Sequence, residues 1–303
     1  MNISSTAPFK LYPVNKSQNN SYSYYSSSPL IQFEWNESFS RVIDPKSLRL
    51  CGKFRMFNLN SNKRLPSNSF DMDMNDQGNH KVCYIDDRVS VSSCIEAVNI
   101  SNMRGNLFEQ CRSYNRNLSS IIPATTSYKD LCSMYQMTFA STPNNDCISR
   151  MSASDILFCL PLRTGFLQNP QPLLLSYGGL SIQISLGSTA NCLYGTNAQE
   201  FVYEIRDVFI VGKYLNLAQP IKPQNSQLEY SSYYNFLNVM NSGNDHNNLN
   251  LNLSRVSQIY QNFIPSAWNN VEQRKQKEER RTPSRRQCRP AQGTVQKISK
   301  LFY

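Results

Sequence analysis

LSIQISL, residues 180–186, alternates apolar and polar side chains along its whole length. Every second residue is aliphatic, at Leu180, Ile182, Ile184 and Leu186. The residues between them are polar: Ser181, Gln183 and Ser185. Because successive side chains of a β-strand point to opposite faces, this pattern predicts a strand with its aliphatic face buried and its polar face toward water.

The same two-residue period occurs in KSLRLCGKFRMF, residues 46–57. One face of the predicted strand carries Leu48, Leu50, Phe54 and Met56, and the other carries Arg49, Cys51, Lys53 and Arg55. Pro45 directly precedes this stretch and is expected to mark the entry to the strand, since proline cannot donate to a ladder. LIQFEWN, residues 30–36, is expected to be its partner strand.

Further apolar stretches complete the strand pattern. RVSVSS and CIEAVNI are the next apolar segments and cover residues 88–100, and DILFCLPL, residues 155–162, predicts a strand. FVYEIRDVFIVGKYLNL, residues 201–217, predicts either one long strand or two strands joined at Arg206–Asp207.

Two short helices are expected between the strands. Over residues 106–122 the apolar period changes to helical spacing, at Leu107, Cys111, Tyr114 and Leu118. Ser127 and Asp130 resemble a capping box, which predicts a second helix starting at Ser127.

The order of these elements predicts the fold class. Turns rich in Gly, Pro and Asn separate the strand runs, which suits an antiparallel sandwich or barrel. Strands do not alternate with long helices, so a parallel α/β sheet is not expected. The predicted class is therefore all-β, an antiparallel β-sandwich with short helical insertions.

Composition divides the chain into five parts. Residues 1–29 are poor in aliphatic side chains and rich in Ser, Asn and Tyr, which predicts a flexible arm. Residues 30–217 hold the main β domain, and 218–229, with two prolines near its start, is predicted to be a linker. Residues 230–271 begin a second β-like segment, and 272–303 are predicted to be a basic, disordered tail.

Most of the net charge lies in that tail. Residues 272–300 carry ten Lys or Arg side chains against three Glu, and so hold +7 of the net charge of +10. A basic tail on a nearly neutral body predicts non-specific contact with nucleic acid through phosphate charge. The residues expected to make this contact are Arg280, Arg281, Arg285, Arg286 and Arg289. A solvated, disordered end is the alternative interpretation.

No pattern in the chain predicts catalysis or metal binding. Both histidines, His80 and His246, lie in Asn- and Asp-rich loops and are expected to be solvated. Residues 71–82 resemble a calcium loop at their start, but Asp76 occupies the glycine position and Val82 the position of the bidentate Glu. We therefore expect no catalytic, cofactor-binding or metal site, and no enzyme activity.

The nine cysteines include no C-x-x-C pair, and no secretory signal or membrane span is expected. A reducing compartment with free thiols follows from that pattern.

Three segments together resemble a known family. Ile95–Asn99 followed by Gly105, Leu107, Glu109 and Tyr114 is similar to a strand–turn–helix passage of double jelly-roll major capsid proteins. Leu160, Pro161, Leu162 and Gly165 resemble the entry of that family to its late strands, and Ile205, Asp207 and Val208 resemble the end of its first barrel. The resemblance covers about residues 30–217, and it is nearest to polinton-like viruses, adintoviruses and virophages.

The resemblance implies a jelly-roll sandwich with a complete first barrel and a partial second one. It also implies a structural capsid subunit of a DNA virus, made in the host cell cytoplasm and located in the virion. Such subunits form homotrimers with a pseudo-hexameric outline that tile an icosahedral shell with other capsid proteins. Only 83 residues follow residue 220, so we expect a truncated or frame-disrupted second barrel. The alternatives are a single jelly-roll penton or minor capsid protein, or a non-viral β-sandwich binding module.

Overall fold

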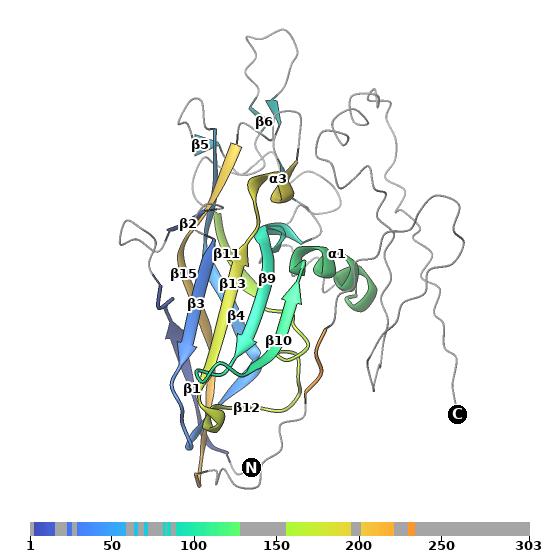
Figure 1. The fold of residues 1–303 in the computed structure, drawn as a ribbon. Helices are drawn as coiled ribbons and strands as arrows, with labels where there is room; N and C mark the ends of the chain where they lie inside the picture. Colours follow the sequence, from blue (N-terminus) through green and yellow to red (C-terminus); the bar gives the residue numbers. More distant parts are fainter. Residues whose placement is uncertain are drawn as a thin grey trace, which may run out of the picture. The chain divides into compact units, whose positions relative to one another are not determined.

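The structure is a computed structural model of the whole chain. It describes residues 3–15, 23–25, 29–58, 64–65, 70–71, 81–82, 84–85, 89–127, 156–194, 201–220 and 230–233. These residues form two antiparallel sheets that pack face to face (Figure 1).

The smaller sheet is built around the alternating stretch that predicts the fold. Its four strands lie in the order β10 (Leu107–Arg112), β9 (Ile95–Ser101), β13 (Leu180–Leu186) and β3 (Leu30–Trp35). The four aliphatic side chains of β13 are all buried, which confirms the predicted inner face. Ser181, on the other face, is also buried, while Gln183 and Ser185 are partly exposed.

The larger sheet contains the two longest strands of the described residues. Its main order is β1 (Ile3–Leu11), β15 (Phe201–Leu217), β4 (Arg41–Asn58) and β11 (Ile156–Pro161). Three short strands extend it: β2 (Ser23–Tyr25) beside β15, and β5 (Arg64–Leu65) and β12 (Leu173–Leu174) beside β4. Two small pairs lie apart from both sheets: β6 (Phe70–Asp71) with β7 (Lys81–Val82), and β8 (Tyr84–Ile85) with β14 (Leu193–Tyr194).

The pairing of the eight main strands is nested. In chain order, the first pairs with the eighth (β1 with β15), the second with the seventh (β3 with β13), the third with the sixth (β4 with β11) and the fourth with the fifth (β9 with β10). One long hairpin folded over on itself gives this order, and it is the topology of a jelly roll. The predicted antiparallel, all-β jelly-roll sandwich is confirmed.

Large side chains from both sheets fill the space between them. The largest that are fully buried are Tyr24, Tyr114, Tyr203, Phe33, Phe54, Phe166, Ile31, Ile43, Leu48 and Leu50. Both sheets contribute to one continuous core, so the interior is packed with side chains as in other close-packed proteins.

A β-bulge decides between the two predictions for residues 201–217, which form one strand. Asp207 and Val208 lie opposite the single residue Gly52, and Asp207 has a left-handed φ of 51°. The extra residue shifts the alternation by one position. Tyr203 and Ile205 are therefore buried before the bulge, and Val208 and Ile210 after it.

A second bulge corrects the role predicted for Pro45. Strand β4 begins at Arg41, so Pro45 lies inside it and does not mark its entry. Asp44 pairs with Lys213 and Arg49 with Val211, which leaves Pro45 in an irregular stretch where no ladder donor is required. The Ser47 hydroxyl donates to the Asp44 carbonyl at 2.7 Å and accepts the Lys213 N–H at 2.8 Å, which replaces the interrupted ladder bonds.

Two further predictions about strands are wrong. Residues 30–36 were expected to partner 46–57, but β3 pairs with β13 in the other sheet. The flexible arm expected over residues 1–29 is wrong for Ile3–Leu11, because these residues form β1 and pair with β15. Alternation identifies strands but carries no information on their partners, because backbone donors and acceptors are the same at every residue.

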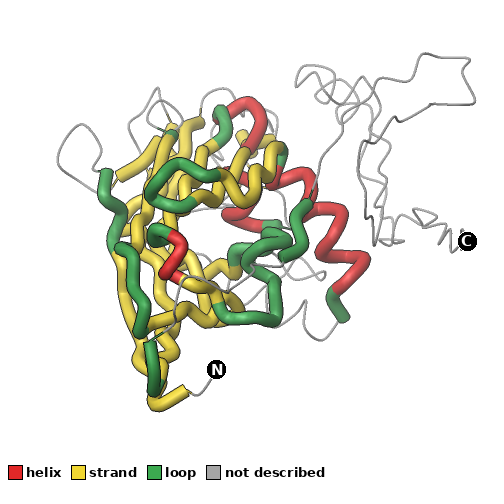
Figure 2. The backbone as a smooth tube through the Cα atoms, turned by 60° about the horizontal axis from the view of Figure 1, so that its bottom comes forward, coloured by secondary structure: helices red, strands yellow, loops and turns green. Residues whose placement is uncertain are grey.

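The helix predicted over 106–122 is correct only in its second half. Leu107–Arg112 form β10, and α1 (Tyr114–Thr125) follows the left-handed Ser113 (φ 51°). Residues four apart share a face in a strand as well as in a helix, so Leu107 and Cys111 could not distinguish the two. Helix α1 lies at the margin of the sandwich, between β10 and β11 in the chain, as an insertion between strands (Figures 1 and 2).

The other helical segments of the described residues are short: η1 (Ser90–Cys94), η3 (Leu175–Tyr177) and α3 (Thr189–Cys192). The helix predicted from Ser127, most of the linker, all but the first residues of the second β segment, and the tail lie outside the described residues.

Candidate functional site

A buried carboxylate, that of Glu109, lies at the outer strand of the smaller sheet. Glu109 is on β10 and is 3% exposed. Its oxygens accept the backbone N–H groups of Gly165 at 3.0 Å, Phe166 at 2.8 Å and Tyr233 at 2.7 Å. Charge-assisted bonds of this kind compensate for removing a carboxylate from water. Glu109 therefore binds two segments that are distant in sequence: the loop after β11 and the segment 230–233.

Helix α1 holds the same loop at a second point. The Tyr114 hydroxyl accepts the Arg163 N–H at 2.8 Å, and burial raises the pKa of this phenol, which keeps it protonated. Within the loop, the buried Thr164 accepts the Leu167 N–H through Oγ1 at 3.1 Å. Burial also raises the pKa of the Cys111 thiol, and the nearby Glu109 carboxylate adds to this shift. The loop after β11 is therefore held at two points, by the Glu109 carboxylate and by the Tyr114 hydroxyl.

Aromatic rings attach the segment 230–233 to this loop. The Phe108 and Phe166 rings stack at 5.1 Å between centroids, with an interplanar angle of 4°. The Tyr230 ring meets both rings edge-on, at 5.0 Å from Phe166 and 6.2 Å from Phe108. The Tyr233 hydroxyl lies 2.9 Å from Oε1 of Gln168 and donates to it. Residues 230–233, which follow β15 in the chain, are therefore bound at the β10 edge. We name the residues that make this contact the exit junction: Glu109, Phe108, Phe166, Tyr230 and Tyr233.

Gly165 makes the close approach of this segment possible. A Cβ atom at Gly165 would lie 2.7 Å from the Ser231 carbonyl oxygen and 2.7 Å from the Ser232 Cα. We expect Gly165→Ala to displace residues 230–233 and to speed hydrogen exchange of the Tyr233 amide at least roughly tenfold, equal to about 1.4 kcal/mol of local protection. Exchange in β13 serves as the internal control and should not change. Unchanged exchange at Tyr233, or loss of protection across β13, would contradict this assignment.

The structure brings together residues from two of the three segments that carry the family resemblance. Glu109 and Tyr114 come from the first segment and Gly165 from the second, and all three take part in holding the loop after β11. The third segment, around Asp207, forms the bulge of β15.

Sequence reasoning did not identify the carboxylate's role or its aromatic neighbours. The available signals were an acidic residue at an inward position, two residues before Cys111, and the tyrosine-rich stretch that starts at Tyr230.

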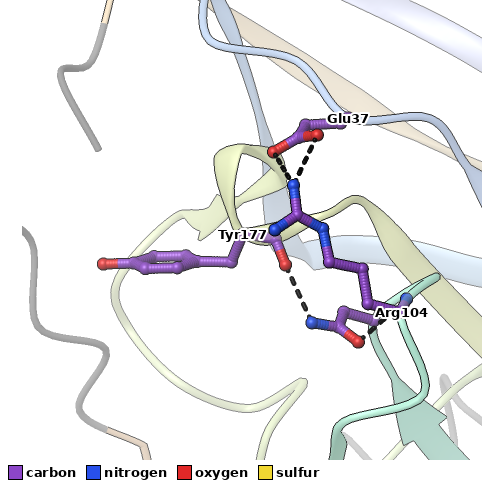
Figure 3. A network of polar contacts seen from close by, with 4 residues as sticks. Glu37, Arg104 and Tyr177 are labelled. Atoms are coloured by element: carbon purple, nitrogen blue, oxygen red, sulfur yellow. Dashed lines mark hydrogen bonds and ion pairs between the residues drawn. The ribbon is translucent and has the colours of Figure 1, made fainter. Parts of the chain in front are cut away.

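One end of the sandwich is held by polar contacts among three loops (Figure 3). Arg104 Nη2 lies 3.3 and 3.2 Å from the two carboxylate oxygens of Glu37. Asn102 donates to the Tyr177 carbonyl at 2.9 Å and accepts the N–H of Arg104 at 3.1 Å and of Asn106 at 2.8 Å. The Arg104 side chain is 67% exposed, so the ion pair contributes little, and the Asn102 bonds hold the turn.

Three exposed apolar side chains lie on or directly beside the edge strands of the two sheets. Within the described residues, β1 pairs only with β15 and β3 only with β13. The chain after β1 crosses to β3, where the Val14 N–H donates to the Gln32 carbonyl at 2.8 Å. Tyr12, Val14 and Leu30 are 47%, 52% and 40% exposed, and we name these three residues the β1–β3 flank. Exposed sheet edges and exposed apolar side chains occur at many protein–protein contact sites.

The residues predicted to bind nucleic acid lie outside the described residues, as do His80, His246 and most of the 71–82 loop. The described residues include no group of three or more His, Cys, Asp or Glu side chains placed to hold a metal ion. In the same part of the chain, no helix has the length and apolar character needed to cross a membrane.

No protein-family model matches the chain, and no curated protein matches it. Among solved structures, it is similar to a chain in the cryo-EM structure of the Sputnik virophage, with a TM-score of 0.47 and 10% identity over 74% of this chain and 50% of that one. It is also similar to the mavirus major capsid protein in its crystal structure, with a TM-score of 0.36 and 12% identity over 73% of this chain and 48% of that one. The chain spans about half the length of each of these two structures.

Proposed function

We propose that this chain is a structural capsid subunit that associates with copies of itself and with other capsid proteins in a virion. The observation that carries the proposal is the nested pairing of eight strands into a jelly roll, an architecture shared by viral capsid proteins, lectin domains and cupins. The interior is filled by apolar side chains from both sheets. Because a fold alone does not define a function, the proposal also depends on the surfaces of the barrel.

The β1–β3 flank supports self-association. Burial of Tyr12, Val14 and Leu30 against a second copy would remove exposed apolar area from water. The neighbouring strand β1 also presents the backbone groups of a sheet edge, which a second chain can pair with. Closed symmetric assemblies use such surfaces repeatedly, and a homotrimer with a pseudo-hexameric outline in an icosahedral shell is the form we propose.

The exit junction supports a role in which the chain after the barrel has a fixed starting point. Glu109 and the aromatic rings hold residues 230–233 against the loop after β11. Any segment beyond residue 233 therefore starts at a defined place on the barrel. Contact of the basic tail with packaged nucleic acid, through Arg280 and the arginines that follow it, stays a prediction within this proposal.

Light scattering of the full chain tests the proposal across protein concentration and salt. We expect a mass that corresponds to a trimer or a larger assembly. Val14→Asp should weaken association at least roughly tenfold, because a carboxylate would be buried without a partner. Leu157→Asp is the matched control: Leu157 is 61% exposed on the outer face of the larger sheet, and its replacement should leave the mass unchanged.

The outcomes distinguish the capsid function from the choice of the β1–β3 flank as the contact surface. A folded wild-type monomer at all concentrations would contradict the capsid function and favour a sandwich that binds other ligands. A wild-type assembly that Val14→Asp leaves intact would support self-association and exclude the β1–β3 flank as its surface.

A further inference from the structure

Two cysteines face each other on the outer surface of the larger sheet. Cys51 on β4 and Cys159 on β11 are directly opposite in the antiparallel register, and their Sγ atoms are 3.5 Å apart. The alternating neighbours Leu50, Phe158 and Leu160 point into the core, so both thiols lie on the other face. Cys51 is 8% exposed, Cys159 is partly exposed, and both are free thiols.

We propose that Cys51 and Cys159 form a thiol–disulfide modification site that closes into an intrachain disulfide. Directly opposite residues of an antiparallel pair have Cα atoms about 4.5–5.5 Å apart, inside the range of about 4.4–6.8 Å found in disulfides. The sulfur atoms need to approach to about 2.05 Å, which small side-chain rotations can supply. This inference does not rest on the proposed capsid function.

The surroundings assign a different role to each thiol. The hydrogen bond that Cys51 donates lowers the pKa of Cys159, and the nearby Arg49 guanidinium adds to this effect. Cys159 is also the more exposed of the two, which makes it the attacking thiolate. The hydrogen bond with Cys159 and burial raise the pKa of Cys51, so Cys51 is the second, resolving thiol.

The reaction needs a small-molecule disulfide, for which oxidised glutathione is the probe. The Cys159 thiolate attacks one sulfur of glutathione disulfide, which breaks its S–S bond and releases one glutathione thiolate. Cys51 then loses its proton to solvent, and its sulfur attacks the Cys159 Sγ, which breaks the mixed disulfide and releases the second glutathione. The protein loses two electrons and two protons, and one glutathione disulfide becomes two glutathione thiols.

The experiment uses the full chain, reduced and then exposed to oxidised glutathione, with non-reducing peptide mapping by mass spectrometry. We expect one peptide pair joined through Cys51 and Cys159, with no glutathione attached. Cys51→Ser should instead retain glutathione on Cys159, because the resolving thiol is missing. Cys159→Ser should give neither product at Cys51. Cys111→Ser is the matched control, since Cys111 is 1% exposed, and its loss should leave the Cys51–Cys159 link unchanged.

Thermal unfolding supplies a second readout. The link joins residues 108 positions apart, and it should raise Tm by roughly 5–15 °C in the wild type and by nothing in either single variant. Two results would overturn the proposal. One is a disulfide between Cys159 and any cysteine other than Cys51, and the other is wild-type protein that keeps both thiols after exposure to oxidised glutathione. Repeating the oxidation with Val14→Asp separates this result from self-association, because an intrachain link forms whatever the assembly state.

Discussion

Glu109→Gln is expected to lower the free energy of unfolding by about 2–4 kcal/mol, since buried bonds to a charged acceptor are worth roughly 1.5–3 kcal/mol each and unpaired buried donors are costly. The carboxylate accepts three backbone N–H groups, from Gly165, Phe166 and Tyr233. An amide keeps one acceptor oxygen but turns an NH2 group toward a backbone N–H. At least one donor therefore loses its partner in a site that water does not reach. Urea unfolding of the two proteins measures the difference.

Glu37→Gln is the matched control for that substitution. Glu37 also contacts a donor, the Arg104 guanidinium at 3.2 Å, but the Arg104 side chain is 67% exposed. An exposed ion pair contributes about 0–1 kcal/mol, so this control should change stability by no more than that. If the two substitutions lower the free energy of unfolding equally, the buried hydrogen bonds of Glu109 do not stabilise the fold more than an exposed ion pair does.

Gly179→Ala is expected to have the largest effect on folding, a loss of about 3–5 kcal/mol, because strain at a special backbone conformation combines with overlap in a packed region. Gly179 has a φ of 74°, and an added Cβ would overlap the carbonyl oxygen of Trp35. It would also lie 2.9 Å from the Met103 Cγ and 3.2 Å from the Glu37 N. Backbone atoms of β3 and the following loop cannot move aside without disturbing the β3–β13 pairing. Thermal unfolding and the yield of soluble protein report the loss.

Gly105→Ala separates backbone strain from steric overlap. Gly105 has a φ of 88°, but nothing lies within 4 Å of an added Cβ. Only the left-handed conformation is then penalised, at about 1–2 kcal/mol. A Gly179→Ala protein as stable as the Gly105→Ala protein would disprove the close packing of the two loops around Gly179.

The candidate site was only partly accessible from the sequence. Glu109, Tyr114 and Gly165 stand out in the segments that resemble a known family, yet 56 residues separate Glu109 from Gly165 and 124 separate it from Tyr233. The convergence of three N–H groups on one carboxylate depends on how the loop after β11 and the segment 230–233 fold back to β10. No local pattern encodes such a convergence, because it results from the path of the backbone through the whole jelly roll.

Which of the alternating side chains are buried was likewise predictable in one strand and not in another. The even-numbered inner face from Leu48 to Phe54 was predicted correctly, because one unbroken run of alternation covers it. In β15 the buried positions change from Tyr203 and Ile205 to Val208 and Ile210. This change depends on the bulge opposite Gly52, which exists only once β15 pairs with β4.

Local alternation was sufficient to establish that the chain is all-β and that its strands have one buried face, because burial of every second side chain is a property of each strand alone. The pairing of the strands was determined by tertiary packing. Backbone hydrogen-bonding groups are identical along every strand, so β3 pairs with β13 and β1 with β15 for reasons of packing between the sheets. For the same reason Leu107–Arg112 became a strand: spacing of four residues fits either structure, and pairing with β9 selected one of them.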